Sequence, residues 1–339
     1  MNRHVSTNQL TPPFSSDTLR LDAAREIERI AAAIREQVLK TLRKRGAIVG
    51  LSGGIDSSVT AALCVRALGA KNVLAVFMPE KDSESDSLRL GRQVADGLGI
   101  ASVIEDIAPQ LMAAGCYSRR DDCIRKVVPE FGEGWGCKVV LGNALAATGY
   151  NITSLVVQSP AGEVRKLRMP LDVYLGIVAA TNMKQRTRKQ IEYYHADRLN
   201  YAVSGTPNRL EYDQGFFVKN GDGAADFKPI AHLYKSQVYQ LAEYLGIPQE
   251  IRSRPPTTDT WSLAQTQDEF YFALPHDQMD LCLFGLNNGI PAEAVASAAR
   301  LSVEQVKVVW TDIERKRRAS IYLHQPPLLV EGEGAGTSS

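Results

Sequence analysis

The chain has 339 residues, of which 44% are hydrophobic and 23% charged, the proportions of an ordinary globular enzyme. Its formal net charge of +1 argues against the broad basic field of proteins that bind nucleic acid or anionic membranes. No apolar run reaches the roughly 18 residues that cross a bilayer, and residues 1–16 lack the apolar core of a signal peptide.

The five cysteines are an odd set without a CxxC pair, and we interpret them as reduced thiols of a cytoplasmic protein. Cys116, Cys123 and Cys137 are close enough in sequence to raise a zinc site as the alternative, although no histidine lies between them. Polar composition predicts disorder for residues 1–16 and 329–339. We therefore expect a single domain over residues 17–328.

The first third of the chain alternates helical and strand patterns. Ile27, Ile30 and Ile34 begin a helical periodicity that Gly46 ends. Apolar strands are expected at 47–52, 72–80 and 102–107, with helices between them. Strands that alternate with helices form right-handed βαβ units. These patterns predict an α/β fold, a doubly wound parallel sheet flanked by helices, as in Rossmann-like proteins.

Residues 110–170 break this rhythm and are interpreted as an insertion. They hold a predicted hairpin with its turn at Pro160-Ala161-Gly162. A long basic helix is expected to begin near Asn182. The later predicted elements are a strand at 201–205, a Gly-rich loop at 219–226, and helices at 234–245, 292–299 and 303–318. Ser302 and Gln305 predict a capping box for the last helix.

The strongest chemical motif is LSGGIDSS at residues 51–58, directly after the first predicted strand. That position is the carboxyl edge of the sheet, where ligands of open α/β sheets bind. Gly53 and Gly54 allow backbone N–H groups to approach an anion. The hydroxyl donors of the loop are Ser52, Ser57 and Ser58. Asp56 would be repelled by phosphate unless a cation lay between them, so it is a natural Mg²⁺ ligand. The loop lacks the Gly-Lys-Ser/Thr ending of a Walker loop.

SGGxDS resembles the PP-loop of the ATP pyrophosphatases, which cut ATP between its α- and β-phosphates. Four later motifs resemble those of the ammonia-dependent NAD synthetases, in the same order along the chain. They are NMKQRTRK (182–189), SGTPNRLE (204–211), KNGDGAAD (219–226) and PPTTD (255–259). The resemblance covers roughly residues 20–110 and 170–328, and it implies an adenine nucleotide alpha hydrolase-like fold.

The resemblance also implies roles for individual residues. Glu211 matches the second carboxylate ligand of the ATP-bound Mg²⁺, after Asp56. The residues implied at the ATP site are Met78, whose backbone reads adenine, Thr206 near the adenosine, the phosphate-binding Lys235, and Thr257 at the α-phosphate. Those implied at the dinucleotide substrate are Asn182, Arg186, Lys219, Asp222 and Asp226. Taken alone, the basic run at 182–189 is typical of a solvated helix face, and the aspartates are typical turn formers.

By resemblance, the reaction is the amidation of deamido-NAD⁺ with free ammonia through an acyl-adenylate, giving NAD⁺, AMP and pyrophosphate. The family also implies a homodimer with the dinucleotide site across its interface. Two alternatives stay open: a paralogue that acts on another acid or nucleotide, and a non-catalytic nucleotide sensor. The insertion is expected to form a lid or interface flap beside the acceptor entrance, apart from the ATP site.

Overall fold

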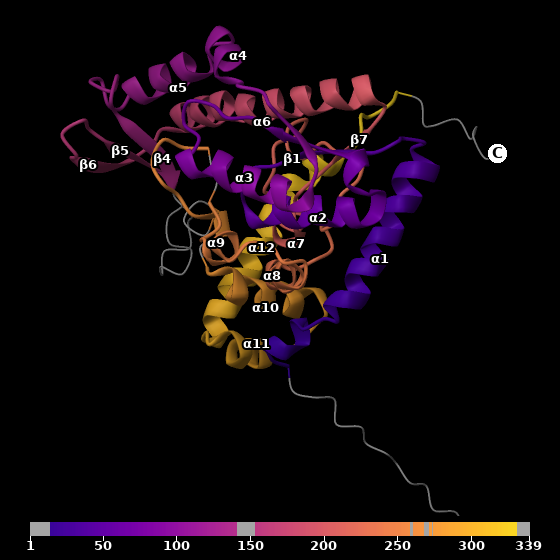
Figure 1. Ribbon diagram of the computed structural model, residues 1–339. Coiled ribbons are helices and arrows are strands. Elements are labelled where there is room, and N and C mark those ends of the chain that lie inside the picture. Colours follow the sequence, from indigo (N-terminus) through magenta and orange to yellow (C-terminus); the bar gives the residue numbers. More distant parts are fainter. Residues whose placement is uncertain (1–13, 141–152, 258–259, 268–270, 273, 331–339) are drawn as a thin grey trace, which may run out of the picture.

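A parallel four-stranded sheet lies at the centre of the molecule (Figure 1). The computed structural model describes residues 14–140, 153–257, 260–267, 271–272 and 274–330. The strand order is β3-β2-β1-β7, with β1 at Ala47–Gly50, β2 at Val73–Phe77, β3 at Ala101–Ile104 and β7 at Ala202–Ser204. All neighbouring pairs are parallel, and Phe227 adds an isolated parallel bridge beside Ser204. The predicted parallel sheet is therefore confirmed.

Helices cover both faces of this sheet, because successive strand residues point to opposite sides. Val49 packs with α1 (Ala23–Arg35), α2 (Ile55–Leu68), α3 (Ser85–Leu98) and α8 (Lys235–Tyr244). Its neighbour Ile48 packs on the other face with Ala196 of α6 (Leu171–Leu199). Figure 1 shows α6 above the sheet and α2 below it. A sheet buried on both faces requires strands that are apolar throughout, as β1 and β2 are.

The basic helix begins earlier than its charge pattern predicts. Helix α6 starts at Leu171, after Pro170 at its N-cap, and runs for 29 residues. Its first half is apolar, with Val173 and Ile177 buried in a core cluster that it shares with the insertion. The prediction of a start near Asn182 was wrong because the basic run occupies only the middle of the helix.

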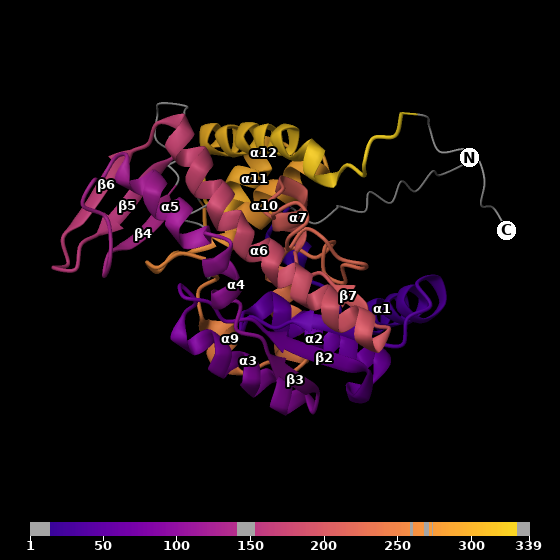
Figure 2. The ribbon, with the colours of Figure 1, turned by 90° about the horizontal axis from the view of Figure 1, so that it is seen from above.

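The insertion forms a small unit beside α6, and its sheet and α5 lie at the left of Figure 1 and of Figure 2. It contains α4 (Ala108–Ala113), α5 (Cys116–Arg125) and an antiparallel sheet of β4 (Gly136–Val140), β5 (Ser154–Gln158) and β6 (Val164–Arg168). The predicted hairpin is confirmed as the β5–β6 pair, with Gly162 at φ +86° in its turn. The unit has its own apolar core, which Trp261 joins from a distant part of the chain.

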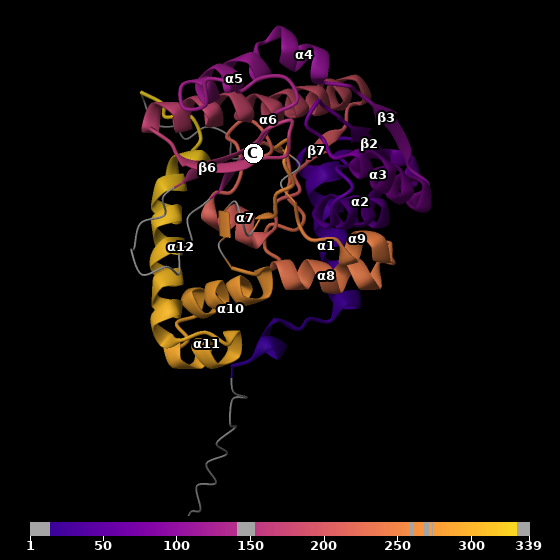
Figure 3. The same ribbon diagram turned by 90° about the vertical axis from the view of Figure 1, so that its left-hand side faces the viewer.

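The C-terminal helices form a second apolar core below the sheet. They are α7 (Arg209–Gln214), α10 (His276–Asn287), α11 (Ala292–Ala299) and α12 (Val303–His324). Helix α9 (Gln249–Ser253) instead packs through Ile251 in the same core cluster as Val49. Figure 3 shows α12 along one side of the molecule, from α11 toward α6. The predicted capping box is confirmed, with the Gln305 N–H donating to Ser302 Oγ at 3.1 Å and the Ser302 N–H to Gln305 Oε1 at 2.8 Å.

Three short turns complete the described chain: a 3-10 turn at Ser16–Leu19, a π-helical turn at Glu36–Thr41 and a 3-10 turn at Ala70–Asn72. Phe14 stacks on Phe284 at 5.8 Å, so the packed chain begins before residue 17. Leu329 and Val330 are exposed and lie outside helices and strands, and residues 1–13 and 331–339, also predicted to be disordered, lie outside the described part. Among the described helices, none is both long and apolar enough to span a membrane.

Candidate active site

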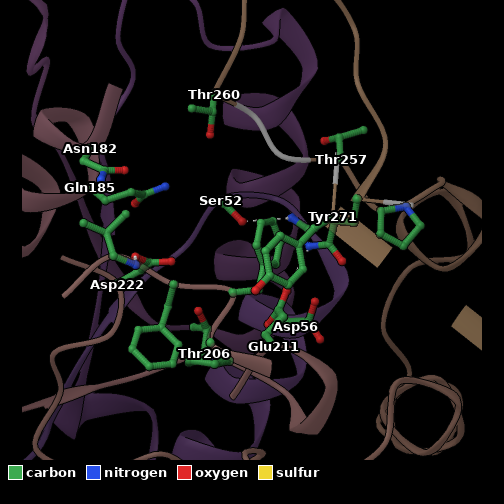
Figure 4. Close-up of a pocket in the computed structure, with 18 of the residues that line it drawn as sticks. Ser52, Asp56, Asn182, Gln185, Thr206, Glu211, Asp222, Thr257, Thr260 and Tyr271 are labelled. Atoms are coloured by element: carbon green, nitrogen blue, oxygen red, sulfur yellow. Dashed lines mark hydrogen bonds between the residues drawn. The ribbon is translucent and has the colours of Figure 1, made fainter. Parts of the chain in front are cut away.

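A cavity of about 560 Å³ opens at the carboxyl edge of the parallel sheet, where the sequence predicted a ligand site. Its walls include the LSGGIDSS loop after β1, Thr206 after β7 and Asn182 of α6 (Figure 4). A smaller cavity of about 220 Å³ adjoins it and contains Met78 in its wall. Both cavities share Ser52, Thr206, Asp222 and Thr257. The two spaces therefore form one bipartite site.

The loop after β1 needs one of its glycines for conformation and leaves the other open to the cavity. Gly53 has φ +79°, and a Cβ there would lie 2.4 Å from the carbonyl oxygen of Ser87. Gly54 has φ −85° and is the N-cap of α2, and a Cβ there would meet nothing closer than Ser52 Oγ at 3.4 Å. The Ser52 and Ser57 hydroxyls line the cavity, 3.1 Å apart. Ser58 is fully buried and donates to the Gly54 carbonyl at 2.7 Å, away from the cavity.

Two carboxylates and a lysine meet at the buried end of the larger cavity. Lys235 Nζ forms an ion pair with Asp56 Oδ2, and Asn208 Nδ2 donates to Asp56 Oδ1 at 3.2 Å. Glu211 accepts the Asn208 backbone N–H at 3.1 Å and Gln267 Nε2 at 2.9 Å. Burial, and then the Asp56 charge, raise the pKa of Glu211 to about 8. Burial lowers the pKa of Lys235, but Asp56 and Glu211 raise it by more.

This donor set fits a hard divalent cation. The raised pKa of Glu211 means that its charged form is unfavourable beside Asp56, even with Lys235 nearby. Additional positive charge would stabilise this charged form. Mg²⁺ is bound typically by one or two carboxylates together with substrate phosphates. Within the described ranges no three His, Cys, Asp or Glu side chains gather around a common point.

Helix α8 presents Lys235 at its first position, and a distant carboxylate holds that end of the helix. The buried side chain of Asp280, in α10, accepts the backbone N–H groups of Lys235 at 3.1 Å and Ser236 at 2.7 Å. Burial raises the pKa of Asp280 to about 7, although these N–H groups lower it. Sequence reasoning missed Asp280, because 45 residues separate it from Lys235 and no local pattern links them.

The basic run on α6 divides between the cavities and the protein interior. Arg186 lines the larger cavity together with Asn182, and Arg188 lines the smaller one. Lys184, which belongs to the basic run that the sequence analysis considered a solvated or substrate-binding helix face, is instead buried. Its Nζ pairs with Glu80 Oε1 at 2.9 Å and Asp82 Oδ2 at 2.6 Å. That part of the interpretation is wrong, since α6 packs with this side against the loop after β2.

The Gly-rich loop contributes two of its three predicted residues to the cavity wall, Lys219 and Asp222. Lys219 Nζ donates to the carbonyls of Tyr322 at 2.6 Å and Gln325 at 3.1 Å, at the end of α12. Asp226 lines neither cavity. Its carboxylate accepts the Val203 backbone N–H at 2.7 Å and therefore supports the end of β7.

Three side chains that the sequence analysis assigned no role also belong to this site. Asn208 and Gln267 bind the two carboxylates directly, and Tyr271 lines the larger cavity. The spacing Asn208-x-x-Glu211 is a capping box of α7, a local signal that could have identified Asn208. Gln267 lies 56 residues from Glu211, so only the tertiary structure brings it there.

The family model described as NAD synthase matches residues 26–127 and 155–320. The chain belongs to the NAD synthase family. This confirms the family predicted from the motifs and, with it, the expected enzyme class, a ligase. A protein of Rhizobium meliloti named NH(3)-dependent NAD(+) synthetase is 68% identical over 331 residues, 98% of each chain. One of the same name from Thermotoga neapolitana is 33% identical, over 86% of this chain and 93% of its own.

Two solved structures share the fold. An NH3-dependent NAD synthetase from Campylobacter jejuni superposes with a TM-score of 0.59 at 22% identity, over 92% of this chain and 100% of its own. An NMN synthetase from Francisella tularensis also gives a TM-score of 0.59, at 21% identity over 91% and 99%. At such identities the likeness concerns the fold alone, and it agrees with the predicted α/β class.

Proposed function

We propose that the chain is an ammonia-dependent NAD synthetase. It would use ATP to join ammonia to the nicotinate carboxylate of deamido-NAD⁺, with NAD⁺, AMP and pyrophosphate as products. The observation that carries the proposal is the set of Asp56, which is partly buried, with the buried Glu211 and Lys235. This set lies beside an open glycine loop, at one end of a cavity whose other walls include a basic helix. The relative with 68% identity carries the same activity in its name.

In the first half-reaction, an oxygen of the nicotinate carboxylate attacks the α-phosphorus of ATP. A P–O bond forms, and the bond to the bridging oxygen of pyrophosphate breaks. Charge then moves onto pyrophosphate, which the positive end of α2 and the ammonium of Lys235 are placed to stabilise. The Gly54 N–H now donates to Ser52 Oγ at 3.3 Å, a weak contact that a phosphate oxygen can replace.

Asp56 and Glu211 are the residues that would hold Mg²⁺ with ATP. When bound there, Mg²⁺ supplies charge neutralisation for the phosphate oxygens. Asn208 orients both carboxylates, through its side chain to Asp56 and its backbone N–H to Glu211. Lys235 stays protonated beside them because its pKa is raised.

In the second half-reaction, the nitrogen of ammonia attacks the acyl carbon of the adenylate. A C–N bond forms, AMP leaves with the bonding electron pair, and the nitrogen loses a proton. Asn182, Arg186 and Lys219 line the part of the cavity that would receive the dinucleotide. Arg186 is exposed, and its Nε donates to the Lys219 carbonyl at 3.2 Å, so these two residues form one wall with positive charge for the dinucleotide phosphates.

A paralogue with the same ATP chemistry and a different acceptor is the second candidate. It is favoured by Val178, an aliphatic residue in the cavity wall, where the resemblance to NAD synthetases implies an aromatic side chain that stacks on the substrate. The acceptor decides between the two candidates, because both release AMP and pyrophosphate.

We also propose that the protein is a cytoplasmic homodimer. All five cysteines are free thiols, which supports a reducing compartment. Exposed apolar side chains on α6 and α12 offer a surface for a second copy: Leu171, Leu175, Tyr194, Ile321 and Tyr322.

The proposal is tested by incubating the protein with ATP, Mg²⁺, ammonium and deamido-NAD⁺. AMP, pyrophosphate and NAD⁺ should appear in equal amounts. A matched reaction with nicotinate mononucleotide in place of deamido-NAD⁺ should be far slower. AMP formed only with nicotinate mononucleotide would favour the paralogue, while ADP and phosphate as the stoichiometric products would contradict both candidates.

A further inference from the structure

We infer that strand β4 of the insertion is a positioning element for the ATP half-reaction. It holds residues 260–267 so that the adjoining Thr257 and Gln267 stay at the phosphate end of the cavity. The inference rests on the proposed function for its chemistry. It replaces the expectation that the insertion serves only the acceptor entrance.

The edge of β4 is bonded to the loop through Cys137 and Val139. The Leu263 N–H donates to the Cys137 carbonyl at 3.3 Å, and the Cys137 N–H donates to Ser262 Oγ at 2.8 Å. The Gln265 side chain, which is 3% exposed, donates from Nε2 to the Val139 carbonyl. The loop thus occupies the free edge of the β4-β5-β6 sheet, and backbone groups at that edge find their partners there.

A buried ion cluster holds the beginning of the same loop. Lys184 Nζ donates to the Thr260 carbonyl at 2.7 Å, while it pairs with Glu80 and Asp82. Asp82 also pairs with Arg120 of α5 at 2.5 Å. Helix α6 therefore supplies the attachment at Thr260, with Arg120 of α5 bound to the same ion cluster, and the insertion supplies the attachment through β4.

The held loop leads directly to the catalytic end of the cavity. Thr266 forms an antiparallel bridge with Thr257, and the Gln267 N–H donates to the Pro256 carbonyl at 3.0 Å. The Gln267 side chain then donates to Glu211 at 2.9 Å. Figure 4 shows Thr257 and Glu211 in the same pocket wall. The short segment from Gln265 to Gln267 is thus bonded at one end to β4 and at the other to a carboxylate that would hold Mg²⁺.

Strand β4 is an addition to the family pattern, because the family model does not match residues 128–154. An irregular loop that becomes ordered only when ATP binds loses conformational entropy in that step. A loop already bonded to β4 has lost this freedom on folding, so the free energy of ATP binding does not have to offset the entropy loss. The expected gain is tighter ATP binding and faster adenylation, with little effect on acceptor affinity.

The test compares variants at the edge of β4 with a control variant in the β5–β6 turn. Ser262→Ala and the double variant with Gln265→Leu remove bonds to β4. Ser159→Ala is the matched control, because its hydroxyl accepts the Glu163 N–H at 3.1 Å in the β5–β6 turn. The readouts are hydrogen exchange of residues 260–267, Mg·ATP affinity by calorimetry, and pyrophosphate–ATP exchange dependent on deamido-NAD⁺. The double variant should exchange these amides faster and bind Mg·ATP about tenfold more weakly, while the control matches the wild type.

A covalent variant tests the same point in the opposite direction. Ser262 Oγ lies 3.8 Å from Cys137 Sγ, so Ser262→Cys with diamide as oxidant should bond the loop to β4. The oxidised protein should keep wild-type Mg·ATP affinity, and reduction with dithiothreitol should weaken it. Loss of affinity in the oxidised protein would show that the loop must leave β4 to bind ATP, and would overturn the inference.

The inference would also be overturned if the double variant showed unchanged hydrogen exchange of residues 260–267. Faster hydrogen exchange of these residues with unchanged Mg·ATP affinity would overturn it too. If the double variant does not fold, Ser262→Ala alone gives the same comparison. If the wild-type protein binds Mg·ATP but shows no pyrophosphate–ATP exchange in the presence of deamido-NAD⁺, that result contradicts the proposed function instead. The hydrogen-exchange and affinity comparisons then still decide the role of β4.

Discussion

Replacing Lys184 by methionine distinguishes a buried structural cation from a substrate-binding one. The side chain of Lys184 is 1% exposed, and those of its partners Glu80 and Asp82 are 0% and 5% exposed. Lys184→Met keeps the length of the side chain but removes the ammonium. Arg186→Met, two residues along the same helix, is the control, because Arg186 is exposed and lines the cavity.

The expected loss follows from the burial of the cluster. Removal of one partner from a buried ion pair costs about 3–5 kcal/mol, because the remaining charge is left uncompensated. Arg120 still pairs with Asp82, so a value near the lower end is expected. Unfolding entropy of about 2.1 cal/mol/K per residue is about 0.7 kcal/mol/K for 339 residues. The melting temperature should therefore fall by about 4–5 °C.

Calorimetry and steady-state kinetics together check this prediction. Lys184→Met should show the lower melting temperature with an unchanged KM for deamido-NAD⁺. Arg186→Met should melt within about 1 °C of the wild type, with a raised KM for the dinucleotide. If Lys184→Met melts like the wild type and its KM for deamido-NAD⁺ rises tenfold, Lys184 binds substrate and the reasoning is refuted.

Four further predictions concern the glycine loop, the carboxylates, the α8 support and the assembly. Gly53→Ala should destabilise the fold by about 1–3 kcal/mol, because its φ is +79° and a Cβ would approach a carbonyl oxygen to 2.4 Å. Gly54→Ala should have the melting temperature of the wild type but a raised KM for ATP. Equal melting temperatures for the two variants would contradict this difference. Asp56→Asn and Glu211→Gln should each lower kcat by about 10²–10³-fold with unchanged circular dichroism, and near-normal turnover in either would remove it from the metal site. The pKa of Asp280 is raised from 3.8 to about 7, so its contribution to stability is full below about pH 4 and is lost as pH rises through about 7. The unfolding free energy of the wild type relative to Asp280→Asn, measured in urea, should therefore fall by up to about 4 kcal/mol between pH 4 and pH 8, and a pH-independent difference would contradict the burial argument. Light scattering should give the mass of a dimer, and a fully active monomer would rule out a site that needs two copies.

Features that depend on neighbouring residues were predictable. The alternation of short apolar strands with helices predicted the parallel sheet. The motif at 51–58, placed directly after a buried strand, located the cavity, because the carboxyl ends of parallel strands meet at one edge. Ser302 and Gln305 predicted their own capping box three residues apart. In each case the interacting groups are near in sequence or follow from the regular geometry of one element.

The tertiary structure alone decided which side of each element meets which partner. Periodicity could not separate Lys184 from Arg186 on one helix, because the partners of Lys184 lie in a loop 102 residues away. The same applies to Asp280 beneath Lys235 and to β4 beside residues 260–265. These contacts join segments that are far apart in sequence, and their energy depends on burial and on charges that only the folded chain brings together.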